Sequence, residues 1–183
     1  MNVLFYGNCQ AKAVLKTLNL GDTYNIFHIA CYLKNKIDKQ YFTDIIKKCD
    51  IIITQSINDS YRDEDYLSTS YIIKHKKSNC KLILFDSCYF NFYYFDLTHK
   101  MFNNDKLNKP IRYHYNEMIE CYDSNKSIEY YITNFVNNLD LKTNEELEII
   151  AQNSLKQLQN RHKNTKEKYE HENIFIIGTH EYI

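Results

Sequence analysis

The sequence predicts an α/β protein, a three-layer parallel sheet covered by helices, with a mainly helical C-terminal half. Three observations predict this class. Short β-rich apolar runs alternate with amphipathic segments through the first half, which is typical of right-handed strand–helix–strand units. Two of these runs, residues 50–54 and 81–85, are almost continuously apolar, as strands buried on both faces are. Apolar residues at helical spacing follow in the second half.

The elements of the first half can be placed in order. Residues 3–6 form a β-rich run, and Ala11, Val14, Leu15 and Leu18 then recur on one face of a helix that we expect to end near Gly21. The elements expected next are a strand at 25–29, a helix at 41–48, a strand at 50–54, a helix at 64–76 and a strand at 81–85.

The second half reads as helices with a short apolar end. One helical stripe is expected from Ile128, Tyr131, Ile132, Phe135 and Leu139. A Thr-x-x-Glu capping box begins another helix, whose apolar face runs to residue 158. Residues 159–173 are polar on every side, which indicates a solvated helix end or a mobile tether. Residues 174–178 fit an edge strand or a tail that docks on a partner, which leaves a homo-oligomer open.

The 183 residues suit one domain, because a chain of this length hides about 70% of its unfolded surface. We divide it into an α/β catalytic core at 1–123, a helical part at 124–172 and an apolar tail or edge strand at 173–183. No repeat or interdomain linker separates these parts.

Composition excludes several functional classes. Lys and Arg (23) balance Asp and Glu (23), whereas nucleic-acid binders need a basic excess. No apolar run approaches the length of a membrane span, and the N-terminus lacks the basic start of a secretory signal. Six cysteines without metal-ligand spacing predict reduced thiols and no metal site. We therefore expect a cytoplasmic protein, whose excess of Asn, Ile, Lys and Tyr reflects a low-GC genome.

Ligands of open parallel sheets bind beyond the carboxyl ends of the strands. Four segments of this chain hold polar or reactive residues at such ends: 7–10, 30–31, 55–62 and 86–89. Their convergence predicts a site at this edge.

Cys9 is the first candidate in that site. It lies at a strand-to-helix turn, where unpaired backbone N–H groups and the positive end of the helix favour a thiolate and an oxyanion. Gly7 permits the tight turn. The alternative is a small buried side chain that packs under the turn.

A nucleophile needs a base, and seven histidines are available. His114 follows the single proline, and His180 follows the final apolar run; spacing alone leaves both open. The others fall in a strand, in charged runs expected to be exposed, or in an unassigned loop: His28; His75, His162 and His171; His99.

Arg62 is one of three arginines in a lysine-rich chain, and its place beyond the third strand suggests a planar clamp for carboxylate or phosphate. The alternative is a surface ion pair with Asp59 or Glu64. The aromatic run at 89–95 fits either an apolar or sugar-stacking pocket or plain filler.

The first strand followed by Gly7-Asn8-Cys9-Gln10 and a helix resembles the WcbI family of polysaccharide-biosynthesis acetyltransferases. Further segments resemble the family in the same order, between residues 55 and 116, so that the likeness covers about residues 2–120. The resemblance implies an architecture of the SGNH or flavodoxin type, binding of coenzyme A and a role in glycan synthesis.

Transferred by position, the resemblance makes Cys9 and His114 the catalytic pair. The residues that it places around the reacting carbonyl and the substrate are Gly7, Asn8, Gln10, Gln55, Tyr61 and Arg62. Asn116 stands where the family is expected to have an acid, so Asp86 or Asp96 is the candidate to orient the histidine, with His180 as the alternative base.

The activity expected is transfer of acetyl from acetyl-CoA to a sugar hydroxyl or amine. Two alternatives remain open at this point. One is an SGNH-like esterase or deacetylase that uses the same site with water as acceptor, and the other is a non-catalytic protein that binds CoA or a glycan.

Overall fold

The computed structural model describes residues 1–33, 36–89, 97–102, 111–136 and 143–178. The chain forms two compact units, one of residues 1–89 with 155–183 and one of residues 90–154. The expectation of one domain stays a prediction.

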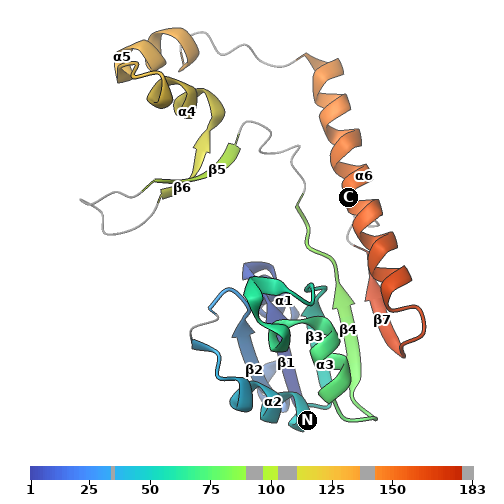
Figure 1. Ribbon diagram of the computed structural model, residues 1–183. Helices are drawn as coiled ribbons and strands as arrows, with labels where there is room; N and C mark the ends of the chain where they lie inside the picture. Colours follow the sequence, from blue (N-terminus) through green and yellow to red (C-terminus); the bar gives the residue numbers. More distant parts are fainter. Residues whose placement is uncertain (34–35, 90–96, 103–110, 137–142, 179–183) are drawn as a thin grey trace. The chain divides into compact units, whose positions relative to one another are not determined.

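The first unit is built on a five-stranded sheet in which every strand pairs in parallel (Figure 1). The order is β2-β1-β3-β4-β7, which is the 2-1-3-4-5 order of flavodoxin-like sheets. The strands are β1 (Asn2–Gly7), β2 (Asn25–Ala30), β3 (Ile51–Gln55), β4 (Lys81–Phe85) and β7 (Ile174–Ile177). The predicted α/β class is confirmed.

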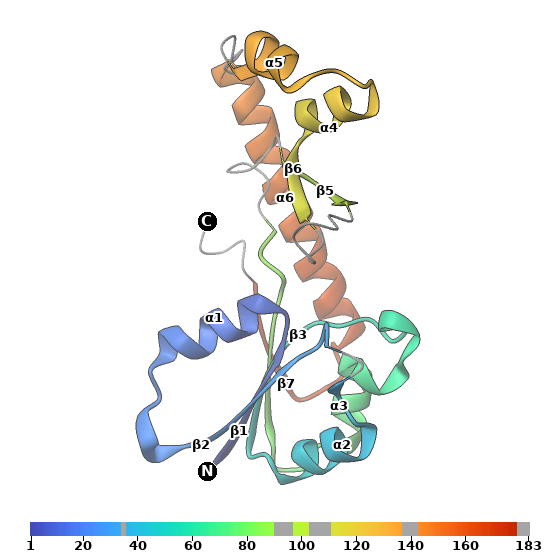
Figure 2. The same ribbon diagram turned by 90° about the vertical axis from the view of Figure 1, so that its left-hand side faces the viewer.

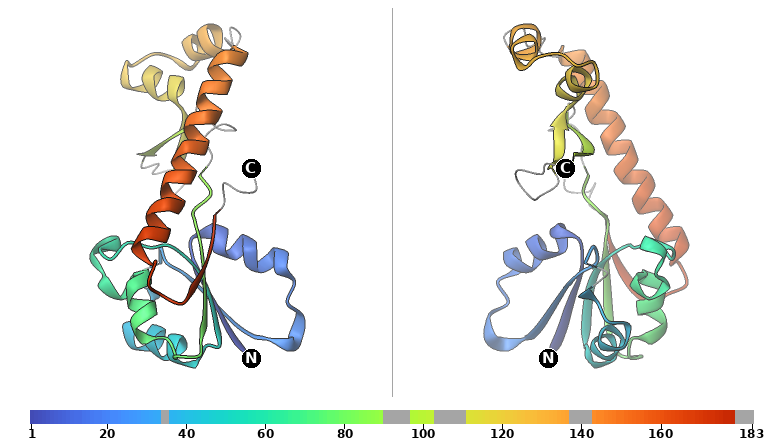
Figure 3. Two further views of the ribbon diagram at one scale, coloured as in Figure 1. Left: turned by 90° about the vertical axis from the view of Figure 1, so that its right-hand side faces the viewer. Right: turned by 60° about the vertical axis from the view of Figure 1, so that its left-hand side comes forward.

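Helices lie on both faces of this sheet. Figure 2 shows α1 (Cys9–Leu18) on one side and α2 (Lys39–Lys48) with α3 (Thr69–His75) on the other. The C-terminal end of α6 (Asn144–Lys168) lies on the same side of the sheet as α3, opposite α1 (Figure 3). The sheet is therefore the middle layer of three.

The core lies between the sheet and α2 and α3. Alternate strand residues point into it, including Leu4, Ile52 and Leu84, and none of these three has exposed surface. The ring of Tyr6 lies 4.7 Å from that of Phe42 in α2. Its buried hydroxyl donates a hydrogen bond to the carbonyl of Leu67, and so the polar atom that enters the core is satisfied.

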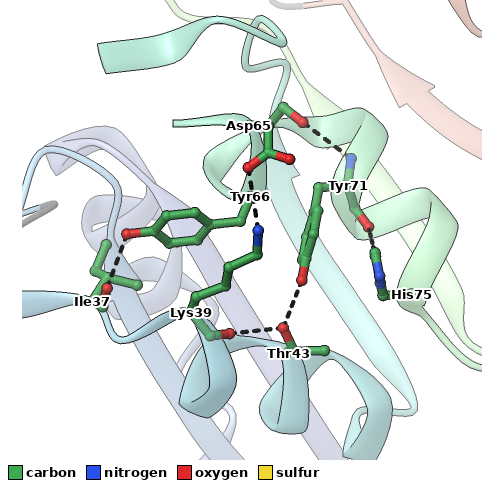
Figure 4. A network of polar contacts seen from close by, with 8 residues as sticks. Ile37, Lys39, Thr43, Asp65, Tyr66, Tyr71 and His75 are labelled. Carbon is green, nitrogen blue, oxygen red and sulfur yellow. Dashed lines mark hydrogen bonds and ion pairs between the residues drawn. The ribbon is translucent and has the colours of Figure 1, made fainter. Parts of the chain in front are cut away.

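Polar side chains join α2 to α3 beside this core (Figure 4). Thr43 Oγ1 donates to the carbonyl of Lys39 at 2.7 Å and lies 2.8 Å from Tyr71 Oη. Tyr66 Oη donates to the carbonyl of Ile37 at 3.1 Å. The Thr43–Tyr71 contact therefore ties α2 to α3, and the Tyr66 bond ties together the segments that precede these two helices.

Two helix boundaries differ from the sequence predictions. The helix expected over 64–76 begins at Thr69, because Ser68 caps it: Ser68 Oγ accepts from the backbone N–H of Tyr71 at 3.1 Å. A short 3₁₀ turn at Asp65–Leu67 precedes it. The first helix ends at Leu18 rather than near Gly21, since Asn19 already has the left-handed conformation that ends helices, with φ of 40°.

The polar segment 159–173 is neither a solvated helix end nor a tether, so that prediction was wrong. Helix α6 continues to Lys168, and Leu158, His162, Thr165 and Tyr169 are all buried. Their spacing of four, three and four residues places them on one helical face. The sequence did not predict this buried face, because two of its members are polar and their neighbours are charged.

The capping box that begins this helix is confirmed: the Thr143 N–H donates to Glu146 Oε2 at 2.8 Å, and the Glu146 N–H donates to Thr143 Oγ1 at 3.2 Å. The apolar end is an edge strand: of the strands that the structure describes, β7 pairs in parallel with β4 alone.

The second unit contains an antiparallel pair of strands that the sequence did not predict. Its strands β5 (Leu97–Phe102) and β6 (Ile111–Tyr115) pair antiparallel, and α4 (Asn116–Asp123) follows. The stripe expected at 128–139 starts as α5 (Ile128–Tyr131) and continues as a π-helical turn at Ile132–Val136. Its described apolar side chains are largely exposed, Ile128 at 73%, and Leu139 lies outside the described residues.

Among the described helices, none is both long enough and apolar enough to cross a membrane.

Two substitutions in α2 test the position of the core. Ile46→Ala removes a fully buried side chain and should lower the free energy of unfolding by about 2–5 kcal/mol. Tyr41→Ala, at a position 58% exposed in the same helix, should change it by less than about 0.5 kcal/mol. Urea unfolding measures both, and equal losses would contradict the core as described.

Candidate functional site

The turn between β1 and α1 requires glycine. Gly7 has φ of +151°, and a Cβ at this position would lie 2.6 Å from Gln55 Oε1 and 3.1 Å from the Cβ of Ala11. A methyl group would thus push the Gln55 side chain away from the turn. Gly7 is the residue that lets the end of β3 approach the end of β1.

Asn8 caps the helix that follows. Its Oδ1 accepts from the Gln10 N–H at 2.8 Å, and its own backbone N–H donates to Gln55 Oε1 at 2.7 Å. Cys9 is consequently the first residue of α1, and its side chain is exposed. Among the described residues, the Cys9 thiol makes no hydrogen bond. The alternative of a buried Cys9 is therefore wrong.

Gln55 and Gln10 connect the turn to the end of β4. Gln55 Nε2 donates to Gln10 Oε1 at 2.9 Å and to Ser87 Oγ at 3.0 Å. Gln10 Oε1 also accepts from the Cys88 N–H at 3.1 Å, and Gln10 Nε2 donates to the Cys88 carbonyl at 2.8 Å. We call Gln10, Gln55, Ser87 and Cys88, together with Asn8, the amide network.

The amide network brings together three predicted site residues: Asn8, Gln10 and Gln55. Their side-chain and backbone amides bond to one another and to Ser87 and Cys88, which follow β4. These bonds fix the backbone around Cys9. Their expected role beside a reacting carbonyl stays a prediction. The network spans the carboxyl ends of β1, β3 and β4, and β1 and β3 flank the point where the strand order reverses, which is the usual ligand position in such sheets.

Cys31 and Tyr61 lie on the β2 side of the turn. The Cys31 N–H donates to the Gly7 carbonyl at 2.8 Å, and Cys31 Sγ lies 3.7 Å from Tyr61 Oη. Burial raises the pKa of the Cys31 thiol, and the Tyr61 hydrogen bond and the Arg62 charge act in the opposite direction. The nearby Cys9 raises it further. Cys31 is thus a neutral, buried neighbour of Cys9.

Arg62 has an exposed guanidinium on a strained backbone. Its φ is 56° and that of Asp63 is 63°, both in the left-handed region that such residues seldom occupy. Arg62 Nη1 donates to the Tyr32 carbonyl at 3.0 Å. Asp59, one of the two alternative ion-pair partners of Arg62, pairs with Lys168 at 2.9 Å. A cationic group is thereby held on the same side of the turn as Cys31 and Tyr61.

Several predicted site residues cannot be placed by side chain. His114 belongs to β6 in the second unit, and its side chain lies outside the described part. Asp96, His180 and most of the aromatic run, from Phe90 onward, also lie outside the described residues. The pairing of Cys9 with His114 therefore stays a prediction.

Asp86 has partners that the sequence did not predict. Its Oδ2 lies 3.0 Å from His162 Nδ1, and its Oδ1 accepts from Thr165 Oγ1 at 2.9 Å. The expectation that His162 is exposed was wrong, since only 5% of it is accessible. The side chain is drawn inside because Asp86, itself buried, needs hydrogen-bond partners there.

The described residues contain no group of three or more potential metal ligands.

Comparison with known proteins gives a family and a fold. The model of the family described as "Polysaccharide biosynthesis enzyme WcbI" matches residues 2–171. A solved structure described as WcbI, "a novel polysaccharide biosynthesis enzyme", matches the whole chain with a TM-score of 0.74 and 15% identity. That structure is the native protein without a disulfide bond between coenzyme A and one of its cysteines. The present chain spans 58% of that protein's length. Among curated proteins, no match is found.

Alkylation should separate the cysteines into two classes. Cys9 and Cys88 are exposed and should react quickly with iodoacetamide, whereas the buried Cys31, Cys49 and Cys80 should not. Burial raises the pKa of Cys49 to about 12, which leaves about 10³-fold less thiolate at pH 8 than an ordinary thiol has. Peptide mapping by mass spectrometry locates the label, and all cysteines should react after unfolding. Fast labelling of Cys31 in the folded protein would contradict the geometry.

Two glycine substitutions test the close approach of Gln55. Gly21 has a left-handed backbone with φ of 61°, and a Cβ added there would have no atom within 4 Å. Gly21→Ala should therefore lower the free energy of unfolding by about 1 kcal/mol, through backbone strain alone. Gly7→Ala should cost about 1–3 kcal/mol more, because the displaced Gln55 leaves buried hydrogen-bonding groups unpaired. Chemical unfolding compares them. An equal loss in both variants would mean that the Gln55 contact contributes nothing.

Proposed function

The chain belongs to the WcbI family of polysaccharide biosynthesis enzymes, and on this premise we propose that it transfers an acyl group, acetyl in the simplest case, from acyl-CoA to a sugar hydroxyl or amine. One observation carries the proposal: an exposed cysteine begins α1 at the carboxyl edge of the sheet, on a backbone fixed by the amide network. An exposed thiol at the first position of a helix is suited to chemistry rather than to packing.

The N-terminus of α1 supports two roles for this position. The first N–H groups of a helix lack partners within the helix and carry partial positive charge. Asn8 occupies one of them, that of Gln10, through its side chain. This environment favours negative charge on the oxygen of a tetrahedral intermediate, and Cys9 stands beside it as the nucleophile.

The residues around Cys9 fit coenzyme A as the acyl donor. A solved WcbI protein is described with reference to a disulfide between coenzyme A and a cysteine, and Cys9 is the residue of this chain suited to meet the thiol end of that molecule. Arg62 provides an exposed guanidinium suited to phosphate. Acyl-CoA supplies the acyl group as a thioester, which a thiolate attacks readily.

In the covalent version of the reaction, Cys9 carries the acyl group between donor and acceptor. Its sulfur bonds to the acyl carbon, the bond to the CoA sulfur breaks, and CoA leaves as a thiol after taking a proton. His114 then removes the proton of the acceptor, whose oxygen or nitrogen attacks the acyl carbon and releases Cys9. In the direct version, His114 activates the acceptor and Cys9 shapes the oxyanion site.

A sugar is the acceptor that best fits both the family and the rim of the site. Tyr89 is 56% exposed and receives a hydrogen bond from Asn8 Nδ2 at 3.1 Å, so its ring is held beside the turn that carries Cys9. An exposed aromatic ring in a fixed position is the usual stacking surface for a sugar.

Intact-mass measurement after mixing with acetyl-CoA tests the covalent version. We expect an acetyl adduct that maps to Cys9, that is absent from Cys9→Ser, and that still forms in Cys88→Ala, in which the backbone bonds to Gln10 are kept. Turnover without any adduct would leave the direct version, in which losing Cys9 costs about 10²–10³-fold in rate.

Ligand binding and acceptor use test the activity as a whole. CoA at a hundredfold excess over its dissociation constant should stabilise the protein by about 2.7 kcal/mol, visible as a rise in the melting temperature. The protein should acetylate sugars only when acetyl-CoA is present. Hydrolysis of small acyl esters without CoA would show an esterase instead, and CoA binding without turnover would show a binding protein.

A further inference from the structure

Arg161, in the C-terminal half of α6, holds the chain just after β4. Its Nη1 donates to the Ser87 carbonyl at 3.2 Å and its Nη2 to the Tyr89 carbonyl at 3.1 Å. The guanidinium carbon also lies 5.9 Å from the centre of the Tyr89 ring. One rigid planar group thereby fixes two carbonyls that lie on either side of Cys88.

His162, the next residue, anchors the start of the same segment. It lies 3.0 Å from Asp86 Oδ2, while Thr165 occupies Asp86 Oδ1 at 2.9 Å. The side chains of His162 and Asp86 are 7% and 3% exposed. A carboxylate buried to this extent needs such partners to stay inside. Residues 86–89 are therefore tied to α6 at both ends.

The segment held in this way touches the residues on both sides of Cys9. The Cys88 backbone makes two hydrogen bonds to the Gln10 side chain, and Tyr89 Oη receives one from Asn8 Nδ2. Residues 87–89 connect Arg161 to Asn8 and Gln10, the neighbours of Cys9. Any shift of residues 87–89 must alter the bonds of Asn8 and Gln10.

We propose that Arg161 and His162 are positioning residues of the Cys9 site, which fix residues 86–89 as the wall that holds Asn8 and Gln10 in place. The inference deepens the proposed acyl transfer and rests on it for its meaning, although the positioning can be measured without any substrate. Neither side chain takes part in chemistry: Arg161 is bonded to carbonyl groups and His162 is buried. Their contribution is to orient the turn that carries the thiol.

Hydrogen–deuterium exchange on Arg161→Met is the direct test. The variant keeps an apolar stem and loses the bonds to Ser87 and Tyr89. We expect the amides of Cys88 and Gln10 to exchange at least about tenfold faster, because charge-assisted hydrogen bonds that closed the segment are gone. The amide of Cys31, bonded to Gly7 on the other side of the turn, should exchange at the wild-type rate.

Lys163→Met is the matched control. It removes the same charge from the same helix, at a surface position where Lys163 pairs with Glu167 at 3.7 Å, and it should leave Cys88 and Gln10 unchanged. Arg161→Lys keeps the charge without the planar fork and should give an intermediate effect. If Arg161→Met does not fold, Arg161→Lys against Lys163→Met carries the test.

A second measurement follows the thiol itself. All proteins in this measurement carry Cys88→Ala, and the rate of Cys9 alkylation is followed against pH. Adding an Arg161 substitution should change this rate, whereas adding Lys163→Met should not. Unchanged exchange at Cys88 and Gln10, or faster exchange that includes Cys31 equally, would overturn the proposal. Because neither measurement uses CoA or sugar, failure of acyl transfer would leave these results standing, and their failure would not touch acyl transfer.

Discussion

The hydrogen bonds of the Gln55 side chain are the constraint on which the site depends. Only 2% of this residue is accessible, and its amide bonds to the Asn8 N–H, Gln10 Oε1 and Ser87 Oγ. These partners come from the ends of β1 and β4 and from the first turn of α1. A buried amide left unpaired costs about 1–3 kcal/mol, so the loss of one partner would destabilise the whole set of bonds. Gly7 leaves the space that the Gln55 amide occupies.

The central sheet could be predicted from sequence because each of its strands is a continuous or nearly continuous apolar run. The observed strands β1, β2 and β3 differ from the predicted ranges by one residue at one or both ends, and β4 has the predicted range. The capping box at Thr143 was equally readable, since its pattern is local. Two features were not predicted: Ser68 starts α3 late through a side-chain bond to Tyr71, and β5 pairs with β6 across residues that carry no run of apolar side chains.

Part of the candidate site could be predicted for a similar reason. Ligand sites of parallel sheets lie at strand ends, and so Cys9, Gln10 and Gln55 could be brought together from their places in the chain. Arg161 and His162 could not, because a polar helical face looks like a solvated one until its partner is known. Asp86, the partner of His162, lies 76 residues away in sequence, and the partners of Arg161 are about as distant from it; β7, which follows α6, pairs with β4, which precedes Asp86.

Parallel pairing of β7 with β4 also sets an order on biosynthesis. When Asp86 and the open edge of β4 leave the ribosome, the residues that cover them, Thr165 and β7, have not yet been made. The nascent chain must keep a carboxylate and a row of strand amides in water until residues 161–177 emerge. The wall beside Cys9 therefore closes only after these residues have been made, and a growing polypeptide carries the thiol long before it carries the contacts that hold its turn.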